Sequence, residues 1–313
     1  MTTYILGRLS AMPVTLLLVT LTVFLLIFAG GDPAVVLGGD EADRATLQQI
    51  RAEFGLDRPV VVQYADWLLR VVRGDLGRSM RTHQLVSVEI GRRMVPTLQL
   101  GVLAVAISLA IAVPAGIISA VRRNTIPDYA SRLLAILGIS LPNFWLGILL
   151  VLGLAVLLPW LPAGGYIDPF TDPLEGLKTL LLPVVTLGMG MAGVLTRMIR
   201  SSMLDVLGED YVRTARSKGL VESVVVLRHA MRNALIPVVT VLGLQVRTII
   251  GGTIVIETLF ALPGVGRMLV DGFFARDFPL VQGVILVIAL SVVLANLVVD
   301  VAYAYLDPRI RYA

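Results

Sequence analysis

Cysteine is absent from this chain of 313 residues, histidine occurs only twice, and 15% of the residues are charged. Without cysteine the chain forms no disulfide and offers no thiolate ligand to a metal. The two histidines, His83 and His229, lie far apart in the sequence and outside the usual spacings of metal ligands. We therefore expect no metal site.

Lysine is also scarce, and its two positions exclude one large class of nucleotide sites. A P-loop requires a glycine directly before its lysine, because backbone amides and the lysine together cradle the phosphates. Here Lys178 follows Leu177, and Lys218 follows Ser217. The sequence has no Ser/His/Asp set, carboxylate pair or HExxH motif either, so we expect no catalytic residue and no cofactor in this chain. If ATP drives its function, the motor is another polypeptide.

Long apolar runs are abundant: 57% of the residues are hydrophobic, and the mean hydropathy is +0.86. A helix crosses a bilayer with about 20 apolar residues. Six segments reach that length, at residues 9–30, 97–121, 133–158, 180–199, 234–259 and 280–305. The composition therefore predicts an all-α membrane protein with six transmembrane helices.

The first span has an alternative interpretation, because an N-terminal apolar segment can be a cleaved signal peptide. Its apolar core, residues 11–29, exceeds the about 7–15 residues of that class, and five more spans follow. We interpret it as an uncleaved anchor.

Proline and glycine indicate how the spans begin, bend and pack. A missing N–H costs nothing in the first turn of a helix, so prolines near span starts are expected to mark them. These are Pro96, Pro183, Pro237 and Pro279. Pro114 and Pro142 lie inside the second and third spans and predict kinks there. Glycines in the fourth and fifth spans predict close helix contacts. These are Gly188, Gly190, Gly193, Gly243, Gly251 and Gly252.

The positions of the basic residues predict the orientation in the membrane. The pI of 9.6 would also suit a nucleic-acid-binding protein, but the arginines cluster beside apolar segments, so we expect no nucleic acid. Loops 121–132 and 197–233 are rich in arginine, whereas loop 159–179 is mostly acidic. This pattern places both termini in the cytoplasm and region 31–95 outside.

Region 31–95 is the largest polar stretch and predicts a small helical extracytoplasmic subdomain. Within it, residues 45–54 and 60–72 have helical patterns, with LDRP as a break between them. The chain then divides into the N-terminus with the first span (1–30), this subdomain (31–95), and a core of five spans (96–313). The core carries a cytoplasmic loop at residues 200–234.

A short charged stretch, DYVRTARSKG at residues 210–219, lies in that cytoplasmic loop. Residues at steps of three and four predict one apolar stripe on a helix. They are Leu204, Leu207, Tyr211 and Ala215. Glu209 and Arg213 predict an i,i+4 ion pair, and Gly219 predicts a left-handed C-terminal cap. An amphipathic helix of this kind can anchor a loop to the membrane surface. Its small residues suit insertion into a groove of a partner protein equally well.

The stretch resembles the cytoplasmic motif of ABC-importer permeases, which reads Glu-Ala-Ala, three residues, then Gly. Arg213, Thr214 and Ala215 occupy the first three positions and Gly219 the last. The departure at the first two positions is typical of the dipeptide/oligopeptide/nickel branch. Motifs similar to that branch follow one another along almost the whole chain. They are YILGRL (4–9), GDPA (31–34), FGLDRPVVVQY (54–64), RGDLGRS (73–79), LPNFWLG (141–147), RHAMRNALIPVVTVLGLQ (228–245), ETLFALPGVGR (257–267) and LDPRIR (306–311).

This resemblance implies the type I ABC importer (MetI-like) permease fold in a bacterial plasma (inner) membrane. The N-terminal motifs resemble the B-type (DppB/OppB-like) subunit, which implies a homologous C-type permease as heterodimer partner. It also implies two ABC ATPase subunits that hold ATP and Mg, an extracytoplasmic peptide-binding protein and surrounding membrane lipid. The stretch at 210–219 would be the coupling helix to the ATPase. Its residues are Asp210, Tyr211, Arg213, Thr214, Ala215, Arg216, Lys218 and Gly219.

The resemblance implies import of dipeptides or oligopeptides, with nickel chelates or glutathione as alternatives. A secondary transporter is a more remote alternative. It would use intramembrane carboxylates and internal repeats. The interiors of the spans contain no Asp or Glu, and no clear repeat is present.

Polar residues inside the spans are candidates for the translocation path, namely Asn143, Gln245, Arg247 and Asn296. Interhelical hydrogen bonds, worth about 0.6 kcal/mol each, are the alternative role. Arg247 stands out because it lies about twelve residues into its span, where an arginine costs at least ~2.5–3.5 kcal/mol.

The stretch 260–278 should lie outside, between the fifth and sixth spans. It is more apolar than a solvent-exposed connecting loop usually is, and it is a candidate external gate. The gate residues are Leu262, Pro263, Val265, Met268, Phe273 and Phe274. Plain packing against region 31–95 is the alternative.

Overall fold

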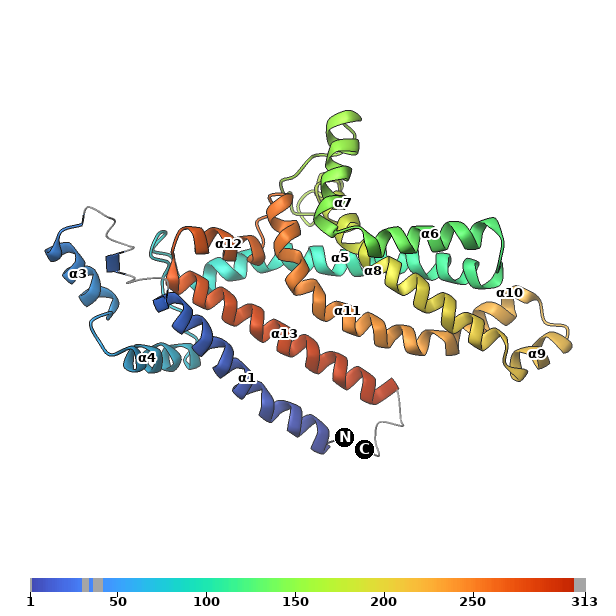
Figure 1. The fold of residues 1–313 in the computed structure, drawn as a ribbon, viewed down its shortest axis with the longest axis horizontal. Coiled ribbons are helices and arrows are strands. Elements are labelled where there is room, and N and C mark those ends of the chain that lie inside the picture. The colour runs from blue at the N-terminus through green and yellow to red at the C-terminus, as the bar shows by residue number, and fades with distance from the viewer. Residues whose placement is uncertain (1, 30–33, 36–41, 307–313) are drawn as a thin grey trace. The chain divides into compact units, whose positions relative to one another are not determined.

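The computed structural model describes residues 2–29, 34–35 and 42–306, without the side chains of residues 2–9, 11, 26–29, 50, 53, 54, 247, 248, 250 and 300–306. The described chain is helical apart from its connections and one isolated β-bridge between Arg78 and Leu85 (Figure 1). Helices suit a bilayer because they satisfy the backbone hydrogen bonds within one segment. The chain forms two compact units. The first comprises Met1–Val95 with Gly264–Leu297, and the second comprises Pro96–Pro263 with Val298–Ala313.

The first unit contains the long helices α1 and α13 and three shorter elements. Its helices are α1 (Thr2–Ala29), α3 (Arg44–Phe54), α4 (Val60–Val72), α12 (Val265–Phe274) and most of α13 (Phe278–Leu306). Both predicted helices of region 31–95 are confirmed as α3 and α4. Asp43 accepts a hydrogen bond from the Thr46 amide and begins α3, while Gly55 ends it at φ +66°. Tyr64 of α4 lies over α1, with its hydroxyl 2.9 Å from Thr20 Oγ1 and its ring against Phe24.

The RGDLGRS motif folds against the beginning of α13, and Asp277 holds the two together. Its buried carboxylate accepts hydrogen bonds from the amides of Met80 and Leu280 and from the hydroxyl of Ser79. Asp277 is therefore the N-cap of α13 and the anchor of the loop at once. Gly77 lies in the left-handed region at φ +84°, which lets the loop turn toward α13.

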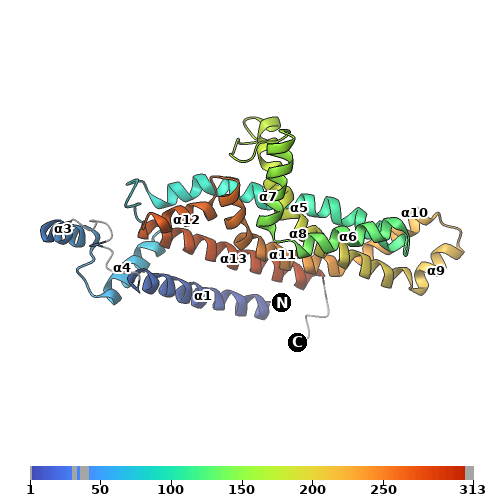
Figure 2. The ribbon, with the colours of Figure 1, turned by 45° about the horizontal axis from the view of Figure 1, so that its top comes forward.

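The second unit is built around α8, which packs on several other helices of the unit (Figure 2). Its elements are the larger part of α5 (Val86–Val121), α6 (Ile126–Ser140), α7 (Asn143–Leu150), η1 (Val151–Leu157), α8 (Pro173–Leu207), α9 (Asp210–Ser217), α10 (Glu222–Val224), η2 (Val225–Ala230) and α11 (Met231–Leu259). The elements η1 and η2 are stretches of π-helix.

Glycines allow α8 to touch the backbones of its neighbours, as predicted for Gly188, Gly190 and Gly193. A Cβ at Gly193 would lie 2.6 Å from the Ala135 carbonyl oxygen of α6. A Cβ at Gly188 would lie 3.0 Å from the Ala104 carbonyl oxygen of α5. Helices approach this closely only where both sides are small.

The fifth-span glycines differ from one another. Gly243 packs on Val299 and Gly252 on Leu187, which confirms two of the three predicted contacts. A Cβ at Gly251 would meet no atom within 4 Å among the described residues. Gly251 is therefore not a helix contact there.

The third predicted span is a broken pair of helices rather than one kinked helix. Helices α6 and α7 meet at 109°, with Leu141 and Pro142 between them (Figure 1). Leu141 is extended (φ −82°, ψ +126°), because a proline ring excludes the helical conformation from the residue before it. The prediction of a kink at Pro142 therefore underestimated the bend.

The other prolines do not mark the helix starts that we expected, except Pro279 in the first turn of α13. Pro96, Pro183 and Pro237 lie inside α5, α8 and α11, which begin earlier than predicted. Such prolines are tolerated in membrane helices because neighbouring groups satisfy the freed carbonyls.

The long apolar helices match the predicted spans in place. Within the described residues, four helices are long and apolar enough to cross a membrane, or five if the bent pair is one span. The four are Val86–Val121, Pro173–Leu207, Glu222–Val246 and Phe278–Val299. In α1, which is 28 residues long, the described apolar part is Met12–Leu25.

A buried ion pair ties α6 to α8. The fully buried carboxylate of Asp128 accepts two hydrogen bonds from Arg200, at 2.9 and 3.1 Å. It also accepts hydrogen bonds from the hydroxyl of Ser119, on α5, and the amide of Asn124. Three elements thus converge on one carboxylate.

Replacing Asp128 with Asn should destabilise the protein, because it leaves the Arg200 guanidinium without its buried partner. Breaking a buried pair costs about 3–5 kcal/mol. The matched control is Asp66→Asn, which breaks the exposed pair with Arg58 and should cost less than about 1 kcal/mol. Thermal unfolding in detergent measures both, and equal shifts in Tm would contradict a structural role for the buried pair.

Candidate functional site

Helix α9 is a separate short helix between α8 and α11. Helix α8 ends at Leu207, Gly208 and Glu209 form a break, and α9 begins at Asp210. After Ser217 the chain turns at Gly219, whose φ of +78° confirms the predicted left-handed cap. Figures 1 and 2 show α9 and α10 at the tip of the second unit, beyond the ends of α8 and α11.

The buried face of α9 differs from the predicted stripe. Val212 and Ala215 pack against Val225 of η2 and against the end of α8, while Tyr211 is 40% exposed. The prediction treated residues 204–215 as one helix. The break at Gly208 changes the rotational phase, so that Val212 instead of Tyr211 faces inward.

The ion pairs of α9 also differ from the prediction. Glu209 is the N-cap residue and lies outside the helix, so Arg213 pairs with Asp210 at 3.3 Å. Arg216 makes a two-point contact with Glu222 of α10, at 2.8 and 3.1 Å. This second pair, which we did not predict, joins the end of α9 to the next element.

Tyr211 connects α9 to α11. Its hydroxyl accepts a hydrogen bond from Nδ2 of Asn233 at 2.8 Å and lies 3.5 Å from the carbonyl oxygen of His229. Nearby, Ser202 of α8 donates to the carbonyl of Ala234. Asn233 was missed as a site residue, although it lies in the RHAMRN part of a quoted motif.

The outward face of α9 is polar, carries small residues and includes charges of both signs, with Asp210 paired to Arg213. Arg213 is 72% exposed, and Thr214, Ser217 and Lys218 are exposed beside it. The hydroxyls of Thr214 and Ser217 bond back to carbonyls one turn earlier, which keeps them close to the helix. A polar surface without bulky side chains of this kind can enter a groove on another protein.

Two of the four candidate path residues meet at one turn of α8. Gln245 donates to the carbonyl of Met191 at 3.3 Å, and Asn143 lies against Gly190, 2.9 Å from where a Cβ would be. The side chain of Arg247 lies outside the described residues. Asn296 belongs to the first unit, and its Oδ1 is buried without a hydrogen-bond partner among the described residues.

The six candidate gate residues fall into different environments. Leu262 is buried in the core of the second unit, with Pro263 partly buried after it. Val265 and Met268 are buried in the first unit, in one cluster with Val86 and Ile90 of region 31–95. For these two residues the structure therefore shows the alternative role, packing against that region. The rings of Phe273 and Phe274, by contrast, are 68% and 80% exposed and stand edge to face.

Helices long enough to span a membrane, with the short capped α9 between two of them, define a polytopic membrane protein. The chain belongs to the family described as binding-protein-dependent transport system inner membrane component. That family model matches residues 112–312, and a model of the N-terminal part of such membrane components matches residues 1–101.

Curated relatives and a solved structure agree with this membership. A Brucella abortus protein named as a peptide transport system permease is 46% identical over the full length of both chains. The glutathione transport system permease protein GsiC of Escherichia coli is 44% identical, again over the full length of both. The MetNI methionine ABC transporter, solved in inward-facing conformations, is 18% identical with a TM-score of 0.54 over 70% of this chain and 96% of that one.

The protein is therefore a permease subunit of an ABC importer with the MetI-like fold. It is a non-catalytic membrane subunit, and ATP hydrolysis resides in partner ATPase subunits. An importer of this family also works with a substrate-binding protein.

Ala215→Trp should displace α9 from its packing contact with η2, because Ala215 is 6% exposed and lies against Val225. Thr214→Trp adds the same bulk on the exposed face and should leave the packing of α9 on η2 intact. Hydrogen–deuterium exchange of residues 210–217 should rise markedly in the first variant and stay unchanged in the second. Equal exchange in both would contradict this packing of α9.

Proposed function

We propose that this permease imports small peptides and that α9 is the coupling helix that docks into an ATPase subunit. The observation that carries the proposal is the way α9 is held. One face is buried on η2, while Tyr211 and Arg216 connect its two ends to α11 and α10. The opposite face, with Arg213 and Thr214, is left open to a partner.

Because of these connections, a movement of α9 would be transmitted to the neighbouring helices. A displacement of α9 by the ATPase would move η2 through Val212 and the beginning of α11 through Asn233. Helix α11 is bonded to α8 by Ser202 and Gln245, so the two long helices would follow together. A surface anchor would need no such connections to the long helices, and this favours the coupling role.

The assembly follows the same proposal. A homologous C-type permease would complete the translocation path, two ABC ATPases would bind ATP and Mg, and a peptide-binding protein would deliver cargo from outside. Both termini and α9 would be cytoplasmic, with region 31–95 extracytoplasmic. Phe273 and Phe274 are exposed on α12, which supports a contact surface for the external partner.

The proposed cargo class is small peptides, and glutathione is the second candidate. Relatives named for peptides and for glutathione match over the whole chain at 46% and 44% identity. Glutathione is itself a tripeptide, so both names point to one chemical class with free carboxylate and amino groups. Asn143 of α7 and Gln245 of α11 contact the same turn of α8 and offer amide groups that suit such a ligand.

Transport by the reconstituted importer with its own binding protein would separate the two cargoes. We expect dipeptides or oligopeptides to accumulate in vesicles and to compete with one another. Uptake of glutathione alone would replace the peptide proposal with the second candidate.

The coupling role predicts that bulk on the open face of α9 blocks docking. Thr214→Trp should abolish copurification of the ATPases and stimulation of ATP hydrolysis by the loaded binding protein. Gly219→Val should lower both, because its left-handed conformation costs a branched residue about 1 kcal/mol or more. Leu177→Trp, an exposed position at the start of α8, is the matched control. Full assembly and full activity of Thr214→Trp would leave α9 as a surface anchor.

The orientation predicts opposite labelling of two engineered cysteines, and the absence of native cysteine keeps the background clean. Gln48→Cys on α3 should react with an impermeant maleimide in intact spheroplasts. Lys218→Cys should react only after the membrane is opened. Both side chains are exposed, so access to each is limited only by the membrane. The reverse pattern would overturn the proposed orientation.

A further inference from the structure

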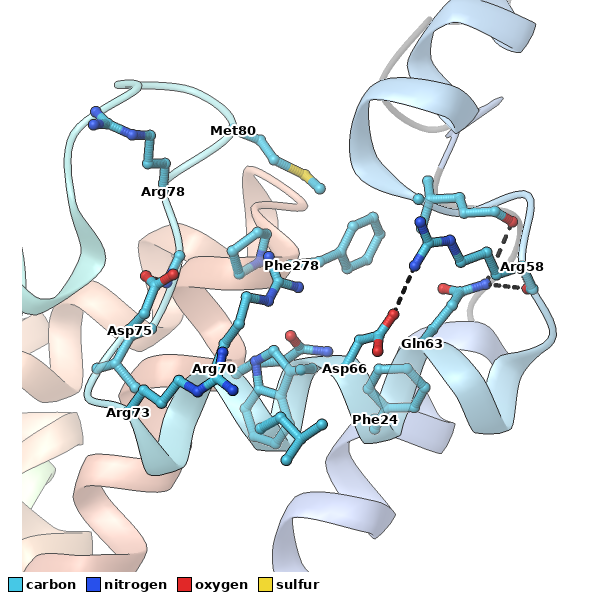
Figure 3. Close-up of a pocket in the computed structure, with 18 of the residues that line it drawn as sticks. Phe24, Arg58, Gln63, Asp66, Arg70, Arg73, Asp75, Arg78, Met80 and Phe278 are labelled. Atoms are coloured by element: carbon cyan, nitrogen blue, oxygen red, sulfur yellow. Dashed lines mark hydrogen bonds and ion pairs between the residues drawn. The ribbon is translucent and has the colours of Figure 1, made fainter.

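The first unit contains a cavity of about 910 Å³ that coupling and transport do not explain. The end of α4, the loop after it and the beginning of α13 line the cavity (Figure 3). Its charged lining residues are Arg58, Arg70, Arg73, Arg78, Asp66 and Asp75. Arginine therefore outnumbers aspartate by four to two.

The two aspartates are already engaged. Asp66 pairs with Arg58 at 2.8 Å, and Asp75 accepts the amide of Gly77 within its own turn. Among the described residues, no side-chain partner reaches the guanidinium groups of Arg70 and Arg73. Figure 3 shows both extending from the end of α4, Arg70 toward Phe278. The cavity thus has a cationic surplus beside an aromatic wall.

Trp67 provides a second, independent sign of a ligand. Its ring lines the cavity and is only 7% exposed, and its Nε1–H has no acceptor among the described residues. A buried donor without an acceptor is rare in folded proteins because its desolvation is uncompensated. An acceptor oxygen of a ligand would satisfy it.

One of the helices that line the cavity, α1, also carries an exposed apolar face. Phe24 of α1 lines the cavity, and exposed residues descend the same helix at steps of four, three and four. They are Leu25, Leu21, Leu18 and Val14. A ligand with an anionic head and apolar tails would place the head in the cavity and the tails along this face.

We infer that the cavity binds the phosphodiester headgroup of an anionic phospholipid. Guanidinium groups present forked donors that match phosphate oxygens. Arg70 and Arg73 would bind the phosphate, and the Trp67 N–H would donate to a headgroup oxygen. Basic and aromatic residues together at the end of a membrane helix are typical of the lipid headgroup region. The cationic surplus favours phosphatidylglycerol over a zwitterionic lipid.

The test uses the full-length permease, purified in detergent, stripped of lipid and titrated with phosphatidylglycerol in native mass spectrometry. The double variant Arg70→Gln/Arg73→Gln should weaken retention of the first phosphatidylglycerol at least tenfold. Arg44→Gln/Arg81→Gln removes two exposed arginines outside the cavity and should leave it unchanged. Trp67→Phe keeps an aromatic side chain, removes the indole N–H and should weaken retention about threefold or more.

Thermal unfolding distinguishes the sources of the anion. Phosphatidylglycerol should raise the Tm of the native chain and not that of the double variant, whereas phosphatidylcholine and inorganic phosphate should raise neither. Equal retention by native chain and double variant would overturn the proposal. Stabilisation by inorganic phosphate alone would assign the cavity to a free anion and also overturn it. So would unchanged lipid retention combined with loss of binding-protein affinity, which would make the arginines a protein-docking surface.

Discussion

The close passage of helix α8 past its neighbours is the constraint on which the second unit depends. Between lipid-facing helices there is no hydrophobic driving force, so packing and small residues decide the contacts. Because Gly188 and Gly193 have no side chain, the backbones of α5 and α6 can pack directly against the backbone of α8 at these two positions. A side chain at either position would push a neighbouring helix outward and displace the groups it carries, including Asp128 at the beginning of α6.

From this packing follow the two places where the permease departs from regular helices. The break at Pro142 turns α7 away from α6 and lays Asn143 on Gly190, next to the turn that Gln245 reaches from α11. At the other end of α8, the break at Gly208 frees α9 to pack on η2. Helix α8 thus positions the polar groups of Asn143 and Gln245 beside its middle and helix α9 at its end, an arrangement that the proposed coupling role would use.

Sequence patterns served well wherever the structure follows local rules. Helix propensity, capping residues and residue size were enough to predict several features. These are the helices at 45–54 and 60–72, the left-handed conformation of Gly219 and the close contacts of Gly188 and Gly193. The prediction that Tyr211 belongs to one apolar stripe was wrong. The stripe assumed a continuous helix, and the break at Gly208 rotates the residues after it relative to those before it. The expected starts at Pro96 and Pro183 were wrong too, since packed neighbours allow a proline inside a membrane helix.

By itself, the sequence determined that the chain is a helical membrane protein, because long uncharged runs leave the backbone no other partner than itself in lipid. Its motifs indicated the ABC-importer permeases by resemblance. The tertiary structure alone decided which side chains meet: Tyr211 with Asn233, Asp128 with Arg200, and Asp277 with the loop of Ser79. It also decided that the arginines at the end of α4 share a cavity with Trp67. These pairings join residues far apart along the chain, and their geometry depends on how whole helices cross, which no local pattern encodes.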